Sequence, residues 1–223
     1  MTNCADVIAE LLAQGGERGG VPFSDNVDYK GAIAWPERGS DERARLIRHI
    51  IGFTNARDGG YLLIGVDDTT KNAIGLTVDQ AHSWDVSRLT EVLAQFAAPV
   101  PVVDVCQAEL PGGELMVAVH IAPFQEQPSV CIQEHTTRRP GSDHERRILR
   151  VGALYVRTSG ASTREVNSES MMRELLERAY LKKGDKLLQQ IRELLQAHGL
   201  KPTEPELPFE NQIESDMGEM GWP

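Results

Sequence analysis

The chain has 223 residues, of which 40% are hydrophobic and 25% charged, and its formal net charge at pH 7 is -10. This composition is typical of a globular protein with a core of its own and excludes a chain that is disordered throughout. No apolar run reaches the roughly 18 residues of a membrane-spanning helix, and the first residues lack the pattern of a signal peptide. We therefore expect a cytoplasmic protein without a membrane partner.

The N-terminal part predicts a helix, a flexible connection and a short strand. Apolar residues at helical spacing indicate a helix over Ala5–Ala13, and glycines between residues 15 and 20 end it. Val27–Lys30 alternates apolar and charged residues, as a half-buried strand does, which puts Asp28 and Lys30 on one face. This acid and base are a candidate functional pair, and a solvated strand face is the alternative.

A second helix is predicted to begin after Ser40. This residue is a suitable N-cap, and two acids follow it where the helix dipole favours negative charge. An apolar stripe runs from Leu46 to Phe53. Four basic residues lie mostly off that stripe: Arg43, Arg45, Arg48 and His49. They could contact phosphate, or they could form only the hydrated side of an amphipathic helix.

The segment Phe53–Asp68 is the one around which we expect the chain to be organised. A Gly-Gly turn precedes the apolar run Tyr61–Val66, which predicts a strand buried on both faces. That strand ends on two adjacent carboxylates, Asp67 and Asp68. If the protein carries out chemistry, we expect it at these carboxylates.

The middle of the chain predicts one helix and a hairpin. The helix begins at Asp79 or at Asp85 and runs to Phe96, because two prolines follow. Val100–Val105 and Leu115–Ile121 have the composition of strands, and the Pro-Gly-Gly sequence between them favours a turn.

Residues 133–150 are polar and charged and contain a Pro-Gly pair, so they predict a long loop. A strand, Ala153–Arg157, follows, and then a run of small hydroxyl residues from Thr158 to Thr163. These hydroxyl groups could donate hydrogen bonds to phosphate, or the run could be a plain turn. Seven arginines fall in this part of the chain: Arg138, Arg139, Arg146, Arg147, Arg150, Arg157 and Arg164. These arginines could therefore form a basic patch, although the protein as a whole is acidic.

Two amphipathic helices are predicted at Met171–Tyr180 and Lys186–Ala197. Beyond them, residues 201–223 hold one base and six acids, so this segment carries -5 of the net charge of -10. Its prolines, acids and isolated apolar residues do not favour independent folding. It could be a solvated end, a segment that docks on a partner, or an acidic mimic that lies over a basic groove.

The three cysteines, Cys4, Cys106 and Cys131, are far apart in the sequence and include no Cys-x-x-Cys pair. This pattern fits neither a disulfide framework nor a usual zinc site. We expect three free thiols that are buried or without a role.

Three of these segments, taken in order, resemble the Schlafen/AlbA-like (Schlafen AlbA_2) nucleic-acid-binding domain family: Val27–Lys30, Phe53–Asp68 and Gly152–Thr163. The linking Val119–Pro123, followed by Pro128, is similar too. The middle segment is the most specific. The resemblance implies an α+β fold in which a mixed β-sheet is flanked by helices. The expected domains are residues 1–20 (N-terminal helix and glycine-rich connection), 21–181 (the Schlafen/AlbA-like domain), 182–199 (C-terminal helix) and 200–223 (acidic, disordered tail).

Endoribonuclease members of this family cut structured RNA such as tRNA with three carboxylates. Clustered carboxylates hold a divalent metal, which polarises a phosphoryl oxygen and activates water. The resemblance makes Asp28 the second acid and Asp67 or Asp68 the third, whereas Phe23 stands at the position of the first acid and Asp25 follows it. The candidate catalytic residues are thus Asp28, Asp67, Asp25 and Asp68, with Asp28 and Asp67 as ligands of Mg²⁺ or Mn²⁺. No nucleotide cofactor is expected, because a Gly-x-x-x-x-Gly-Lys-Ser/Thr loop is absent.

Three functions follow as hypotheses. The first is a nucleic-acid-binding protein that contacts the phosphate backbone of DNA or RNA, with a role in regulation or defence in a microbe by analogy with the family. Its expected contact residues are Lys30, Arg57, Arg157, Ser159, Ser162 and Thr163. The second is a metal-dependent endoribonuclease that acts on structured RNA. The third is a subunit that binds a protein partner through residues 200–223, and a homodimer is a further possibility.

Overall fold

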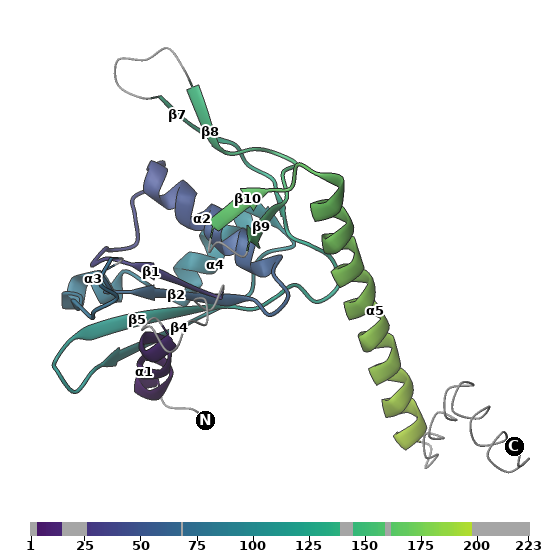
Figure 1. Cartoon of the computed structure of the whole chain (residues 1–223), viewed down its shortest axis with the longest axis horizontal. Coiled ribbons are helices and arrows are strands. Elements are labelled where there is room, and N and C mark those ends of the chain that lie inside the picture. Colours follow the sequence, from purple (N-terminus) through teal and green to yellow (C-terminus); the bar gives the residue numbers. More distant parts are fainter. Residues whose placement is uncertain (1–3, 15–25, 68, 139–144, 159–161, 198–223) are drawn as a thin grey trace, which may run out of the picture. The chain divides into compact units, whose positions relative to one another are not determined.

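The computed structural model of the chain describes residues 4–14, 26–67, 69–138, 145–158 and 162–197. The chain divides into two compact units, Met1–Lys182 and Lys183–Pro223. The first unit contains every strand that the structure describes (Figure 1). Within the described ranges, no helix is both long enough and apolar enough to cross a membrane.

A mixed four-stranded sheet forms the centre of the first unit (Figure 1). In spatial order its strands are β1 (Val27–Lys30), β2 (Gly60–Ile64), β5 (Leu115–Ile121) and β4 (Val103–Glu109). β1 pairs with β2 in parallel, and the other two pairings are antiparallel. The expected α+β fold, with a mixed sheet flanked by helices, is confirmed. The predicted 100–121 hairpin is present, but its first strand begins at Val103.

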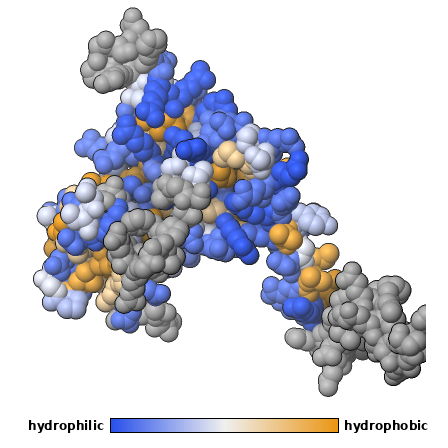
Figure 2. Space-filling model, viewed as in Figure 1, coloured by the Kyte–Doolittle hydropathy of each residue, from blue (hydrophilic) through white to orange (hydrophobic). Residues whose placement is uncertain are grey.

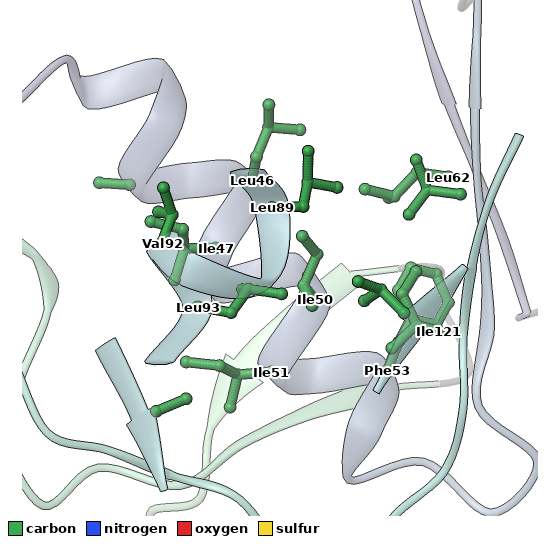
Figure 3. Packing of buried hydrophobic residues seen from close by; sticks show 14 of the residues in the cluster. Leu46, Ile47, Ile50, Ile51, Phe53, Leu62, Leu89, Val92, Leu93 and Ile121 are labelled. Carbon is green, nitrogen blue, oxygen red and sulfur yellow. The ribbon is translucent and has the colours of Figure 1, made fainter. Parts of the chain in front are cut away.

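Helices cover both faces of this sheet (Figure 1). α1 (Cys4–Gln14) packs on one face, and α2 (Asp41–Thr54), α3 (Val78–His82) and α4 (Val86–Phe96) belong to the core on the other face. Because neighbouring residues of a strand point to opposite faces, Leu63 joins the core under α1, whereas Leu62 and Ile64 join the larger core under α2 and α4. Figure 3 shows how the apolar stripes of α2 and α4 meet in that larger core.

Capping residues decide where these helices begin. The side chain of Ser40 accepts a hydrogen bond from the backbone N–H of Arg43, which confirms the predicted N-cap of α2. Thr77 caps α3 and Asp85 caps α4. Of the two predicted starts of the helix that ends at Phe96, Asp85 is therefore confirmed, and the residues from Asp79 belong to the separate short helix α3.

The turn between α2 and β2 needs glycine at two positions. A Cβ atom on Gly59 would overlap the carbonyl oxygen of Ile121, and one on Gly60 would overlap the ring of Phe53. Gly59 also has a φ of +72°, which lies in the left-handed region. The Gly-Gly pair therefore lets β2 start directly under the last turn of α2.

Residues 133–150 do not form the predicted long loop. They contain β7 (His135–Arg138) and β8 (Glu145–Leu149), which pair antiparallel. Buried Ile148 and Leu149 anchor β8 in the core, and His135 Nε2 lies 3.0 Å from Asp41 Oδ1 of α2. The prediction is wrong because the segment is polar overall, so its sequence does not indicate that Ile148 and Leu149 anchor it in the core.

Two more short pairings complete the first unit. β9 (Tyr155–Thr158) and β10 (Ser162–Glu165) form an antiparallel hairpin, of which only the first strand was predicted. β3 (Ala97–Ala98) pairs with β6 (Val130–Cys131).

A single helix, α5 (Glu169–Ala197), replaces the two predicted C-terminal helices. The residues between the predicted helices contain no proline, and one glycine, Gly184, costs a helix only about 1 kcal/mol. That cost is too small to end a helix. The acidic segment 200–223 lies outside the described residues.

Asn55, directly after α2, joins three segments of the chain. The residue is fully buried, and its Nδ2 donates hydrogen bonds of 2.9 Å to the carbonyl oxygens of Ser129 and Tyr155. Its Oδ1 accepts a hydrogen bond of 2.8 Å from the Ser129 N–H. The Asn55 carbonyl oxygen accepts a further hydrogen bond from Arg178 of α5, at 3.0 Å. The end of α2 is thus tied to β9, to the segment before β6 and to α5.

The Asn55→Ala variant should be strongly destabilised. It leaves two buried carbonyl groups and one N–H without their partner, and each such group costs about 1–3 kcal/mol. We expect the free energy of unfolding, measured by urea denaturation, to fall by about 3 kcal/mol or more. Asn72→Ala, at an exposed position, is the control and should leave stability nearly unchanged. Equal urea midpoints for the two variants would contradict the role of Asn55.

The structure corrects the prediction of three free thiols. Cys4 and Cys106 form a disulfide bond that fastens α1 to β4, whereas Cys131 is free and buried. The two partners are 102 positions apart and meet only because α1 packs on the sheet. The spacing of cysteines in the sequence cannot reveal such a pairing.

Reduction of the Cys4–Cys106 bond should destabilise the protein, because the cross-link restricts the unfolded chain. We expect a loss of about 2–4 kcal/mol in the free energy of unfolding when urea denaturation is repeated with dithiothreitol. The Cys106→Ser variant should show the lower stability with and without the reductant. A wild-type protein whose unfolding does not respond to dithiothreitol would count against the bond.

Candidate functional site

A recessed pocket lies where α2, β8 and β10 meet. Its volume is about 150 Å³. The lining residues come from these three elements: Arg45, Arg48, His49, Arg146, Ile148 and Thr163. Figure 2 shows hydrophilic residues over much of the described surface of the first unit. Of the residues that line the pocket, Ile148 is apolar, and Arg45, Arg48 and Arg146 are basic.

Close packing between α2 and β10 brings the pocket together. A Cβ atom on Gly52 would lie 2.6 Å from Thr163 Cγ2, so the missing side chain lets β10 rest directly on α2. Arg48 Nη2 donates a hydrogen bond of 3.0 Å to the Thr163 carbonyl oxygen, and the Arg48 guanidinium lies 5.1 Å from the ring centre of Tyr155. These contacts hold Arg48 in one place, and fixed donors recognise an anion at a lower entropic cost.

An acid lies near the basic side chains of the pocket: Asp41, four residues before Arg45 on α2, interacts electrostatically with Arg45. In the described part of the chain, no carboxylate forms an ion pair with Arg45, Arg48 or Arg146. Buried Arg157 lies beneath them, with its guanidinium 4.4 Å from the ring centre of Phe53. The local field at the pocket is therefore positive although the whole chain is acidic.

Asp28 and Lys30 share a face of β1, as the alternating sequence predicts. Lys30 Nζ lies 3.0 Å from Asp28 Oδ2, and His49 Nδ1 lies 3.3 Å from the same oxygen. Among the described groups, none gives this buried oxygen a hydrogen bond of good geometry, and the ammonium group of Lys30 attracts it by its charge. The pair connects the sheet to the basic pocket through His49.

His49 is held neutral at pH 7. Burial lowers the pKa of its imidazole to about 4; the charge of Asp28 opposes this shift, and the charges of Lys30, Arg157 and Arg48 add to it. Its 3.3 Å approach to Asp28 is consequently not an ion pair at neutral pH, although the distance alone would suggest one. Thr163 Oγ1 and Arg157 Nη1 also lie near His49 Nδ1, at 3.1 and 3.4 Å.

The lowered pKa of His49 predicts a loss of stability in acid. The unfolded imidazole has a pKa of about 6.5, so between pH 6.5 and 4 the unfolded state binds more protons than the folded state. The free energy of unfolding should therefore fall as the pH decreases through this window, by up to about 3 kcal/mol from this residue.

The difference between wild type and His49→Gln isolates this effect from the titration of carboxylates. Urea denaturation at several pH values between 7 and 4 should show a smaller decrease for His49→Gln than for the wild type. His82→Gln, at an exposed histidine of α3, is the matched control and should follow the wild type. A wild-type curve that is parallel to that of His49→Gln would rule out the assignment.

Asp67 serves as a turn residue after β2. Its Oδ1 accepts hydrogen bonds from the backbone N–H groups of Thr69 and Thr70 and from the Thr70 hydroxyl, at 2.7–3.0 Å, and the bonds from Thr70 lower the pKa of Asp67 most. The register between β1 and β2 pairs Asp28 with Leu62 rather than with a residue near Asp67.

Of the four candidate carboxylates of the metal site that the endoribonucleases of the family imply, the structure describes Asp28 and Asp67. Nowhere in the described ranges do three His, Cys, Asp or Glu side chains gather where they could hold a metal ion. Asp28 is paired with Lys30, and Asp67 is used by its own turn. Phe23, Asp25 and Asp68 lie outside the described residues.

Of the six predicted phosphate contacts, Thr163 lines the pocket, and Lys30 and Arg157 lie close to it. Lys30, Arg157 and Thr163 all lie next to His49 or Asp28. Ser162 Oγ lies 2.9 Å from the Thr158 hydroxyl on the same hairpin. Arg57 is exposed in the turn after α2, and none of the described contacts of the pocket includes it. Ser159 lies outside the described residues.

Four polar residues of the pocket were not among the six expected contact residues: Arg45, Arg48, His49 and Arg146. The first three were predicted as a helix face that could contact phosphate, and Arg146 as part of a basic patch. The available signal was the position of the first three off the apolar stripe of α2. That signal alone could not distinguish a binding face from a hydrated one.

A solved structure and a family model match this chain. The DIP2311 protein from Corynebacterium diphtheriae has a solved structure that matches with 21% identity and a TM-score of 0.43. The match covers 72% of this chain and 26% of that one, so the chain spans about a quarter of that protein's length. No curated protein matches the chain. A family model described as Schlafen, AlbA_2 matches residues 24–167, which is more than half of the chain, and the protein therefore belongs to the Schlafen AlbA_2 family.

Proposed function

We propose that the protein binds nucleic acid by contacting phosphate groups at the pocket between α2, β8 and β10. The observation that carries the proposal is the set of Arg45, Arg48 and Arg146 around the Thr163 hydroxyl, with no described carboxylate paired to these arginines. Guanidinium and hydroxyl groups are common phosphate donors in protein–nucleic acid contacts. Membership in the family also suggests a nucleic-acid-related function.

The net charge of -10 does not oppose this proposal. Binding follows the local field, and half of the net charge belongs to residues 201–223, where six acids face one base. Contacts to phosphate alone carry no sequence information, so either DNA or RNA can be the target and sequence preference should be slight.

By analogy with the family, the proposed role is regulation or defence in the cytoplasm of a microbe. The Cys4–Cys106 bond would persist less readily there, because cytosolic thiols are kept reduced.

Replacing one pocket arginine should weaken binding to all sequences alike. Arg146→Gln should raise the Kd for labelled tRNA, single-stranded RNA or duplex DNA by about 5- to 10-fold, because one phosphate contact is lost. The slope of log K against log salt should fall by about one. Fluorescence anisotropy at several salt concentrations measures both quantities.

Arg147→Gln is the matched control. Arg147 is the neighbouring residue of β8, is also exposed, and points to the opposite face of the strand, 3.9 Å from Glu134. Equal losses in the two variants would mean that the pocket is not the contact surface. Failure of all three nucleic acids to bind, even at low salt, would overturn the proposed function.

The same samples also test the alternative functions. Fragments of tRNA that form with Mn²⁺, vanish with EDTA and are absent with Asp28→Asn would show a metal-dependent endoribonuclease. If nucleic-acid binding is lost on deletion of residues 200–223 but kept in the Arg146→Gln variant, the function depends on the tail and a protein partner rather than on the pocket. No contact among the described residues favours either alternative.

A further inference from the structure

The pocket between α2, β8 and β10 has the size of a site for one small group. Its volume of about 150 Å³ is below the roughly 300–1,000 Å³ of pockets that enclose drug-sized ligands. A nucleotide with its base and sugar therefore does not fit inside, whereas a single phosphate group does. The polar groups that line it come from the middle of α2 and from the two strands that pack on this helix, β8 and β10.

The charge of the pocket exceeds what one backbone phosphate requires. Three guanidinium groups, those of Arg45, Arg48 and Arg146, line a single recess. In the described structure none of them forms an ion pair with a carboxylate, although the charge of Asp41 acts on Arg45. A phosphodiester in the backbone carries one negative charge. A terminal phosphomonoester carries about -1.5 to -2 and offers three acceptor oxygens. The arginine set matches the terminal group better.

The neutral side chains of the pocket agree with this ligand. His49 stays uncharged, so the positive charge comes only from groups that do not titrate near neutral pH. Thr163 adds a hydroxyl on the side of β10, and Arg48 is fixed by its hydrogen bond to the Thr163 carbonyl oxygen. Arg45 and Arg146 are exposed at their positions and can close on the ligand from two elements. One fixed donor, Arg48, and two donors that can adjust, Arg45 and Arg146, suit a phosphate group at the end of a nucleic-acid strand.

We propose that this pocket recognises a terminal phosphate of a nucleic-acid strand rather than a phosphate within its backbone. The proposal rests on the proposed function and narrows its substrate to strands with a phosphorylated end. The strand beyond that end would lie outside the pocket, because the recess has room for a single phosphate group. Either a 5′- or a 3′-phosphate supplies the same chemistry, so the experiment has to separate the two ends.

The test compares RNA and DNA oligonucleotides of one sequence that differ only at their ends. Four forms with an internal fluorophore are titrated with the full chain: 5′-phosphate, 3′-phosphate, both and neither. We expect one end phosphate to lower the Kd by about tenfold relative to the form with two hydroxyl ends, because charge-assisted hydrogen bonds are added. Inorganic phosphate at millimolar concentration should compete with the phosphorylated form and leave the unphosphorylated form nearly unaffected.

Variants connect the preference to the pocket. Arg146→Gln should reduce the tenfold preference to about twofold or less, whereas Arg147→Gln should keep it. Circular dichroism spectra of both variants check that they are folded. A lost preference with Arg147→Gln as well as with Arg146→Gln would exclude this pocket as the site.

The outcomes separate this inference from the proposed function. Equal, salt-sensitive binding of all four forms would overturn the recognition of strand ends and leave backbone binding intact. Failure of every form to bind would overturn both. A preference for a phosphorylated end that survives Arg146→Gln would also contradict the inference, because the end would then be recognised elsewhere.

Discussion

The buried side chain of Asn55 is the contact on which the candidate site depends. It fixes the end of α2 against the carbonyl oxygens of Ser129 and Tyr155, and Tyr155 opens the hairpin that carries Arg157 and Thr163. Four residues later, Gly59 and Gly60 start β2 with no room for a side chain. One short stretch thus sets the position of α2 relative to both the sheet and the β9–β10 hairpin. The basic pocket is a consequence of that placement.

The site also shows how a cluster of cations is tolerated in a partly buried place. Repulsion among Lys30, Arg48 and Arg157 would grow if His49 were charged as well, and burial prevents this by lowering the pKa of His49. Asp28 supplies a negative charge on the sheet side, directly at Lys30. The arginines that line the pocket form no ion pair among the described residues, although the charge of Asp41 acts on Arg45. An anionic ligand would complete this charge balance.

The sequence predicted correctly those features that depend on residues close together in the chain. The Ser40 cap, the alternation in β1 and the apolar run of β2 each depend on neighbouring residues, and the structure confirms them. The β7–β8 hairpin and the Cys4–Cys106 bond depend on packing against distant elements, and the predictions there were wrong. The pocket belongs to the second kind, because its residues come from three separate segments. The sequence could therefore indicate basic residues on α2 but not which of them meet Thr163.

The acidity of the whole chain bears on the type of ligand that such a pocket can hold. A protein with a net charge of -10 gains little from long-range attraction to a polyanion, so its affinity has to come from contacts at short range. A small recess with several guanidinium groups supplies such contacts at one point. Recognition of a doubly charged terminal phosphate uses that geometry fully, whereas tracking along a backbone would need a longer basic groove. The charge distribution and the shape of the pocket thus favour the same ligand, and they do so independently of each other.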